Sequence, residues 1–303
     1  MNPFLRKKLI RPITLLSLIF TVFLAEYCYA QLNPLASQYF QNQYLANPAL
    51  AGINGGLTLN GALRQQWSNI PGSPVTQALT ADYRLKNKVG LGLNMYNENA
   101  GLIQRTRMVG SYAYHLPLTE KQQLHFGVSL GFMNQRLMQE QINGDQGDEL
   151  VDQFNLRETY IDGDFGMAYT DDRLNVQAAI PNMKSFFGSD DNKVVDKSTF
   201  YSAVSYRWFF GTGLSSVTLE PKVVFRGVKG YDHLVDAGTN ISMVNNQLIF
   251  TGLYHSSKSA TLGIGLNYKK ALSILGMYTT ETAALRGLSS GNYEIGLRYR
   301  FEN

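Results

Sequence analysis

The chain has 303 residues, with 27 Lys and Arg against 23 Asp and Glu, and its aromatic content of 12% comes mainly from 18 Tyr and 16 Phe. This composition, with 28 Gly and 17% charged residues, excludes a helical membrane protein, a collagen-like chain and a disordered chain. Four cations and one anion fall in the first 30 residues, so the remainder has 23 cations and 22 anions and lacks the charge that a nucleic-acid partner needs.

Residues 1–30 have the order of an export signal. Basic residues from Arg6 to Arg11 precede the apolar run Ile13–Ala25, and small residues follow at Cys28 and Ala30, where a signal peptidase reads. We therefore expect a signal peptide that is cleaved after Ala30. A spanning helix needs about 20 apolar residues, more than this run supplies, although a signal anchor stays an alternative.

The single cysteine of the chain, Cys28, lies before the expected cleavage site. The mature chain then has no disulfide, thiolate metal site or cysteine nucleophile. Cleavage before Cys28, as in a lipoprotein, is the competing interpretation, and the bulky Tyr27 disfavours it.

Residues 31–55 form a distinct N-terminal segment, rich in Gln, Asn and Ala and with two Pro. The composition predicts one or two helical turns around Ser37–Leu45, followed by extended backbone at Asn47-Pro48. Such a segment either lies inside a barrel as a plug or extends into the periplasm.

From residue 56 onwards the apolar residues alternate with a period of two. The clearest example places Leu124, Phe126, Val128, Leu130 and Phe132 on one face and His125, Gly127, Ser129 and Gly131 on the other. A soluble sandwich would place Lys, Glu and Thr on its minority face, whereas this face is rich in Gly, Ser, Asn and Tyr. Aromatic residues also cluster at strand ends, as at Tyr206–Phe210. The pattern favours a membrane barrel whose apolar face contacts lipid.

About 14 alternating segments occur, which predicts an all-β, antiparallel transmembrane β-barrel over residues 56–303. The segments are 57–64, 75–85, 88–97, 106–116, 124–135, 159–169, 173–180, 198–209, 216–226, 232–242, 247–255, 260–268, 272–280 and 291–301. Short turns at 86–88, 170–172 and 269–270 suit the periplasmic side, and the long connectors 137–158 and 181–197 suit the exterior. A miscount by two strands stays open.

The 137–158 connector is acidic, with Glu140, Asp145, Asp148, Glu149 and Asp152. Residues 143–148 superficially resemble a calcium loop but lack its regular acidic spacing and terminal Glu. We therefore interpret the connector as a solvated exterior loop.

Enzymatic chemistry and metal binding have little support. The four histidines, His115, His125, His233 and His255, have no cysteine partner and no close pair in the sequence, so we expect no metal site and no cofactor. His125 and Ser129 share a strand face, but four residues along a strand span roughly 13 Å, too far for a hydrogen bond. We expect no catalytic residues.

Several short motifs together resemble the PorP/SprF family of the type IX secretion system. They are Ser37-Gln38-Tyr39-Phe40, Asn47-Pro48-Ala49-Leu50-Ala51-Gly52, Arg64-Gln65-Gln66-Trp67 with Pro74, Val89-Gly90-Leu91-Gly92-Leu93, Ser111-Tyr112-Ala113-Tyr114, Phe165-Gly166 and Tyr293–Phe301. Their order and spacing span nearly the whole mature chain.

The resemblance implies an integral outer-membrane protein of a Gram-negative bacterium. Family members are thought to engage periplasmic ring components of the secretion machine, or the C-terminal sorting domain of a large secreted surface protein, including adhesins of gliding motility. Partner-binding candidates that follow are Tyr39, Tyr44, Asn47, Pro48, Gly52, Arg64, Gln65 and Trp67. A proline-set turn at Asn47-Pro48, or an interfacial Trp67 beside a lumen-facing Arg64, explains these residues structurally. The alternative function is a channel or transporter for a small solute, with residues 31–55 as its gate.

Overall fold

The computed structural model describes residues 37–138, 159–183, 198–228, 233–282, 287 and 289–301. The expected signal peptide, its cleavage site and nearly all of the acidic 137–158 connector lie outside these residues. No helix within the described ranges is long and apolar enough to cross a membrane. Their regular structure consists of β-strands and short 3-10 turns.

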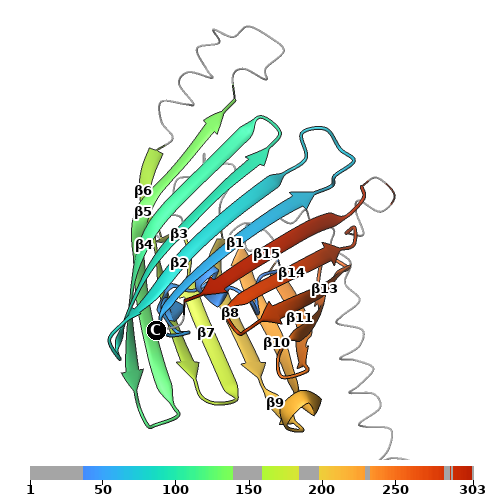
Figure 1. The fold of residues 1–303 in the computed structure, drawn as a ribbon. Coiled ribbons are helices and arrows are strands. Elements are labelled where there is room, and N and C mark those ends of the chain that lie inside the picture. The colour runs from blue at the N-terminus through green and yellow to red at the C-terminus, as the bar shows by residue number, and fades with distance from the viewer. Residues whose placement is uncertain are drawn as a thin grey trace, which may run out of the picture.

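Fifteen strands occur along the described chain, and successive strands alternate up and down except that β9 continues in the direction of β8 (Figure 1). They are β1 (Leu57–Gln66), β2 (Val75–Leu85), β3 (Val89–Ala100), β4 (Ile103–Pro117), β5 (Gln123–Leu137), β6 (Thr159–Thr170), β7 (Leu174–Ile180), β8 (Ser198–Tyr206), β9 (Trp208–Phe210), β10 (Val217–Val228), β11 (Leu234–Met243), β12 (Leu248–His255), β13 (Ser259–Tyr268), β14 (Leu272–Thr279) and β15 (Asn292–Arg300).

Every strand pairs antiparallel with its neighbours, and β15 pairs with β1 to close the sheet. Strands β8 and β9 are separated only by Arg207, and both pair with β10. The architecture is therefore a closed barrel of 14 strands plus the short additional strand β9. This confirms the all-β barrel that the alternation predicted. Strand β4 begins three residues earlier than expected, where Arg105 pairs with Glu98 of β3 at 3.0 Å.

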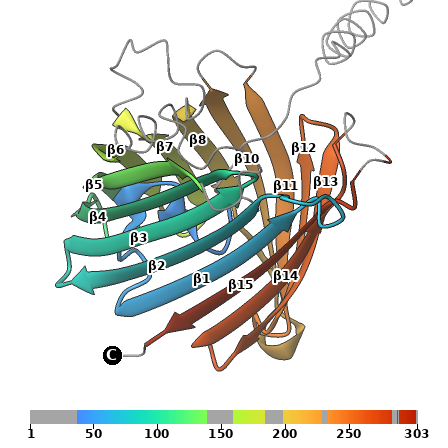
Figure 2. The same cartoon turned by 90° about the horizontal axis from the view of Figure 1, so that it is seen from above.

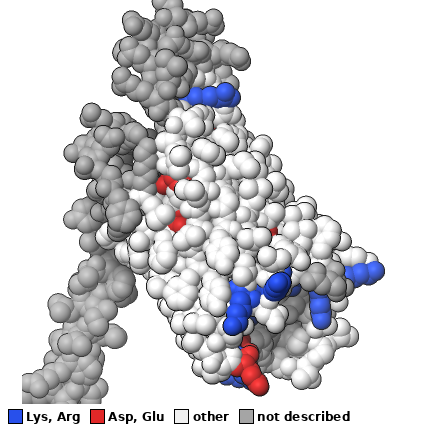
Figure 3. Space-filling view, turned by 90° about the vertical axis from the view of Figure 1, so that its left-hand side faces the viewer, with Lys and Arg blue, Asp and Glu red and all other residues white. Residues whose placement is uncertain are grey.

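The barrel has the polarity that a lipid-facing wall requires. On β5, Leu130 and Phe132 face outward with 68% and 59% of their surface exposed, while His125 and Ser129 are buried on the inner side. Lys and Arg gather near the two ends of the view in Figure 3, and the wall between shows none. A belt of apolar side chains outside a polar interior matches the hydrocarbon layer of a bilayer.

The two ends of the barrel differ in their connectors. At the short-turn end, as we name it, lie the turns 86–88, 118–122, 171–173, 244–247 and 269–271, together with the start of β1 and the end of β15. At the loop end, β5 ends and β6 begins, and β7 ends and β8 begins. The aromatic residues Trp208, Phe209 and Phe210 are exposed near the short-turn end, where an interfacial girdle belongs.

Residues Ser37–Gly52, named the inner segment below, lie within the ring of strands (Figure 2). The segment contains the 3-10 turns η1 (Gln43–Leu45) and η2 (Pro48–Leu50). Asn47 is extended as expected, with φ −146° and ψ 112°, but Pro48 begins η2 instead of continuing the extended backbone. The cause is local: the Asn47 side chain accepts a hydrogen bond from the N–H of Ala49, and proline at the first position fits a helical turn.

Candidate binding site in the lumen

The inner segment begins near the loop end of β15. Glu294, the third residue of that strand, accepts hydrogen bonds from the backbone N–H of Ser37 at 3.2 Å and from the Gln38 amide at 2.5 Å. Ser37 Oγ lies 3.3 Å from Thr261 Oγ1 on β13. Residues separated by more than 220 positions in the sequence therefore fix where the segment starts.

A buried ionic cluster holds Tyr39. Its hydroxyl donates to Asp236 Oδ2 at 2.5 Å, and the same carboxylate receives Arg226 at 2.8 Å and His255 Nδ1 at 2.7 Å. His255 Nε2 lies 2.8 Å from Thr261 Oγ1. All four wall residues are buried, so the carboxylate is compensated by a guanidinium and two further donors, as a buried charge requires.

Two cations of the barrel wall, Lys222 and Arg298, bind backbone carbonyls of the inner segment. Lys222 Nζ donates to the carbonyl of Tyr39 at 2.7 Å and lies 4.7 Å from the centre of the Phe40 ring. Arg298 donates to the carbonyl of Gln41 at 3.3 Å. Charged donors therefore satisfy carbonyls that the interrupted turn leaves free.

Side-chain amides and hydroxyls continue the contact around η1. Asn175 and Gln177 of β7 both donate to Gln43 Oε1, at 2.9 and 2.5 Å. The Tyr44 hydroxyl lies 2.7 Å from Ser111 Oγ of β4. The Tyr44 ring covers Gly92 so closely that a Cβ there would overlap it.

The turn η2 rests directly on the backbone of two strands. Gly127 of β5 faces Pro48 and Ala49, and Gly166 of β6 faces Asn47 and Pro48, with no room for a Cβ at either glycine. The Asn47 amide donates to the carbonyls of Met167 at 3.1 Å and Ala178 at 3.4 Å. Close backbone approach here requires glycine, which explains why the inward face carries so many small residues.

Gly52 ends the inner segment at the short-turn end. Its φ of +73° suits glycine, its N–H donates to Asp82 Oδ2 at 3.0 Å, and its carbonyl accepts from Arg84 Nε at 2.7 Å. One residue earlier, the carbonyl of Ala51 lies 3.0 Å from His115 Nε2. Both sides of the turn are therefore tied to the wall.

The wall pairs two histidines that are ten residues apart in the sequence. His115 and His125 face each other across β4 and β5, with 2.6 Å between their Nδ1 atoms. The spacing along the chain did not indicate this pair, which the strand register creates. Their other ring nitrogens contact Ala51 and Thr170, and the described residues contain no group of three His, Cys, Asp or Glu that could hold a metal ion.

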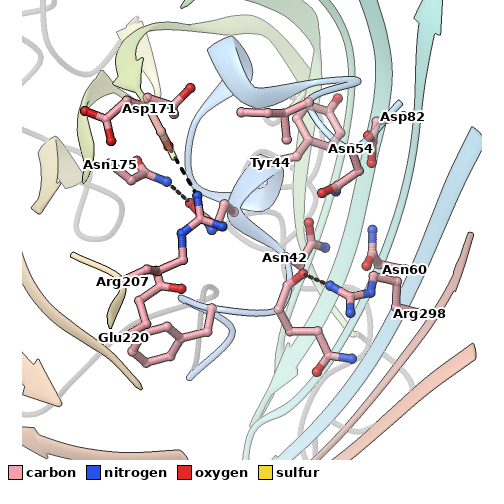
Figure 4. Close-up of a pocket in the computed structure, with 15 residues that line it drawn as sticks. Asn42, Tyr44, Asn54, Asn60, Asp82, Asp171, Asn175, Arg207, Glu220 and Arg298 are labelled. Atoms are coloured by element: carbon pink, nitrogen blue, oxygen red, sulfur yellow. Dashed lines mark hydrogen bonds between the residues drawn. The ribbon is translucent and has the colours of Figure 1, made fainter. Parts of the chain in front are cut away.

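Two cavities lie between the inner segment and the wall at the short-turn end. The smaller, about 250 Å³, is lined by three carboxylates (Asp82, Asp171 and Glu220) and two guanidiniums (Arg207 and Arg298), so its charges nearly balance (Figure 4). The larger, about 680 Å³, is lined by five cations and one carboxylate. These cations are Arg207, Lys269, Lys270, Arg298 and Arg300, and the carboxylate is Glu220. Polypeptide or anionic ligands would find donors here.

Five of the eight partner-binding candidates lie in the inner segment, and the other three lie on or just after β1. Tyr39, Tyr44, Asn47, Pro48 and Gly52 all lie in the inner segment. Arg64 is buried on the lumen face of β1, Gln65 faces outward, and Trp67 follows β1 at the loop end with φ 47°. Arg64 lies close enough to Tyr39 and Glu294 to interact with them electrostatically, whereas Gln65 and Trp67 lie away from the lumen face.

Sequence reasoning missed the wall residues that hold the inner segment, above all Asp236, His255, Lys222 and Glu294. A signal was available, since each is a charged or titratable residue at an inward position of an otherwise alternating strand. Their partners could not be inferred, because Tyr39 meets Asp236 across 197 residues of sequence.

Residues 28–299 match the family model described as type IX secretion system membrane protein PorP/SprF. No curated protein matches the chain. Among solved structures, the outer membrane protein Omp33 of Acinetobacter baumannii is similar, with 10% identity and a TM-score of 0.47 over 82% of this chain and 98% of that one. The KdgM porin has 9% identity and a TM-score of 0.39 over 81% of this chain and 99% of its own. At these values the similarities concern the barrel architecture only.

Proposed function

Because the chain belongs to the type IX secretion system PorP/SprF family of membrane proteins, we propose that it is a non-enzymatic outer-membrane component of that system. It binds periplasmic parts of the machinery, or a large secreted surface protein through its C-terminal sorting domain, and so supports export or attachment of that protein. An adhesin of gliding motility is one cargo of this kind.

The observation that carries this proposal is the way the chain fills its own lumen. The inner segment is fixed to β2, β4, β6, β7, β10, β11 and β15 by hydrogen bonds and rests on Gly127 and Gly166. A barrel occupied in this manner suits an anchor that presents surfaces at its two ends. A general pore needs its lumen for solute.

The proposed topology follows from the connectors. Residues 1–30 are removed after Ala30, residues 31–55 are the plug segment, of which Ser37–Gly52 occupy the lumen, and residues 56–303 form the barrel. The short-turn end faces the periplasm and the loop end faces the exterior, as in bacterial barrels with short periplasmic turns. Periplasmic machinery then meets the turns and the end of the inner segment at Gly52.

We do not propose an enzymatic role, although one cluster has the distances of a hydrolytic triad. Asp236, His255 and Thr261 are linked at 2.7 and 2.8 Å, in the order carboxylate, imidazole, hydroxyl. Thr261 is buried and its hydroxyl also lies 2.6 Å from Thr279 Oγ1. A nucleophile needs access to substrate, so we assign the cluster to anchoring Tyr39.

Affinity purification tests the proposal. The tagged chain is purified from detergent-solubilised outer membranes, and the co-purifying proteins are identified by mass spectrometry against a tagged unrelated barrel. We expect periplasmic secretion components or one large surface protein to be enriched. Recovery of the barrel alone, under conditions in which another known outer-membrane complex survives, would contradict the proposal.

The second candidate is a channel for a small solute, and the cavity of about 680 Å³ at the short-turn end favours it. The two candidates differ in what the intact chain does in liposomes. An anchor leaves them impermeable to small sugars and amino acids, whereas a channel makes them swell. Deleting residues 31–52 separates the candidates further: loss of export of one protein with an assembled barrel supports binding.

A further inference from the structure

The larger cavity at the short-turn end is lined by five cations that form no ion pair with a carboxylate of the described residues. Arg207 donates to the carbonyl of Asp171 at 3.4 Å and Arg298 to that of Gln41 at 3.3 Å. Among the described residues, no carboxylate lies within ion-pair distance of Arg207, Lys269, Lys270, Arg298 or Arg300. The single acidic lining residue, Glu220, is already held by Ser205 at 2.8 Å and Lys222 at 3.8 Å.

The two arginines of β15 face the cavity and not the lipid. Their neighbours Leu297, Tyr299 and Phe301 are exposed on the outer side, and the alternation of a strand turns Arg298 and Arg300 inward. A lipid headgroup at the membrane surface therefore does not meet these guanidiniums. The Nε–H of Arg300 is buried and unsatisfied, and so are both polar atoms of the Gln41 amide on the inner segment.

The remaining lining suits a polypeptide better than a bare anion. Seven side-chain amides contribute paired donors and acceptors: Gln41, Asn54, Asn240, Asn245, Asn246, Gln247 and Asn267. Such amides match the N–H and C=O groups of an extended backbone. Phe40, Phe209, Ile249 and Leu275 add apolar contact, and a volume of about 680 Å³ exceeds what a single small anion fills.

We propose that this cavity is a recognition site for an extended acidic segment of a partner polypeptide, whose carboxylates pair with Arg207, Lys269, Lys270, Arg298 and Arg300. The inference rests on the proposed function, in which the short-turn end meets periplasmic proteins, and it specifies the chemistry of that partner. Arginine pairs with carboxylate through two parallel hydrogen bonds, which gives the site geometric selectivity as well as charge.

Fluorescence anisotropy with short peptides tests the site. The probe is a fluorescein-labelled ten-residue peptide in which Glu alternates with Ser, added to the full mature chain in detergent micelles at low and moderate salt. We expect binding that weakens at least tenfold when Gln replaces every Glu, and that weakens with salt as exposed charge pairs do. Equal binding of the two peptides would overturn the inference.

Variants that remove cavity cations test whether the acidic peptide binds in the larger cavity. Arg298→Gln with Arg300→Gln, and separately Lys269→Gln with Lys270→Gln, should each weaken binding of the acidic peptide about tenfold. The matched control is Lys86→Gln with Lys88→Gln, which removes two cations from a turn at the same end that does not line the cavity. It should change affinity less than twofold. The hydrogen bonds from wall cations to Tyr39 and Gln41 come from Lys222 and Arg298, so the result of the lysine pair stands even where loss of Arg298 disturbs Gln41.

Further outcomes distinguish a site for an acidic polypeptide from non-specific charge attraction, from a small-anion site and from a failure of the proposed function. Equal losses in the control variant would show non-specific attraction, and full competition by citrate at the peptide's own concentration would show a small-anion site; either overturns the inference. If the peptide fails to bind while the tagged chain still captures periplasmic components, the site is wrong and the proposed function stands. If the tagged chain captures no periplasmic component while the peptide binds, the site is supported and the proposed function is wrong.

Discussion

The two halves of the inner segment meet the barrel wall in different ways. Tyr44–Gly52 rests on strand backbone, with glycines beneath Tyr44, Pro48 and Ala51 and no space for a Cβ. Ser37–Gln43 is held largely by long polar side chains of the wall, although Tyr39 also packs in a buried apolar cluster with Tyr201 and Val224, and the two cavities lie beside it. Close packing on backbone should make the first region the more sensitive to added volume. Buried charge pairs should make the second region the more sensitive to the loss of a charge.

The largest effect is expected where a charge is removed from the polar half. Asp236→Asn leaves Arg226 buried without its carboxylate, which costs about 3–5 kcal/mol. Urea unfolding of the refolded barrel measures this loss. The matched control is Asp172→Asn, whose ion pair with Lys121 at 3.1 Å is exposed, so that about 0–1 kcal/mol is expected. Equal losses of unfolding free energy in Asp236→Asn and Asp172→Asn would mean that the buried charges of the polar half do not stabilise it more than an exposed ion pair does.

Added volume should damage the packed half next. Gly127→Val places a side chain against Pro48 and Ala49, and overpacking of this kind costs about 1–3 kcal/mol. Limited proteolysis should then cut the displaced inner segment near Asn47. Gly110→Val is the control, because Gly110 faces outward on β4 with open space around it. Protection of the segment in Gly127→Val would contradict the packing described here.

A smaller loss is expected at the amide that seats η2. Asn47→Ala removes the cap of that turn and two hydrogen bonds to strand carbonyls, at a cost of about 1–2 kcal/mol. Thermal unfolding, followed by the loss of the compact gel band of the folded barrel, measures the change. Asn87→Ala in the exposed 86–88 turn should have no measurable effect.

The smallest effect on stability is expected beside the larger cavity. Lys269→Gln with Lys270→Gln removes two exposed cations that form no ion pair with any described carboxylate, so the free energy of unfolding should change by less than about 0.5 kcal/mol. The same urea titration measures it. A loss of several kcal/mol would mean that these lysines hold the fold together and are not available to a ligand.

The fold could be predicted from the sequence to a large extent, because one physical rule determines it. A strand such as 124–135 must place Phe126 and Leu130 in lipid and Ser129 in the lumen, and this alternation is visible without coordinates. Turn positions such as 86–88 follow from the same pattern. Strand β9 could not be predicted as separate, since its break from β8 at Arg207 leaves the alternating segment 198–209 continuous in sequence.

The lumen contacts could be predicted only in part. The motifs Val89–Leu93, Phe165-Gly166 and Tyr293–Phe301 stood out in the sequence, and the structure shows that Gly90, Gly166 and Glu294 within them contact the inner segment. Which residue meets which partner depends on the register of a closed sheet. A single alternating sequence carries no information about that register, so Asp236 gave no indication of Tyr39, and His115 gave none of His125.

Closure by β15 has a consequence for the order of assembly. The strand that seals the barrel against β1 also receives Ser37 and Gln38 at Glu294 and Gln41 at Arg298. Contacts between chain ends carry a high loop-closure cost and form late. A chain that lacks β15 can neither seal its wall against β1 nor hold Ser37 and Gln38 at Glu294, so this strand must be in place before the barrel closes around the start of the inner segment. Closure of the wall and placement of the N-terminal end of the inner segment are therefore coupled through one strand.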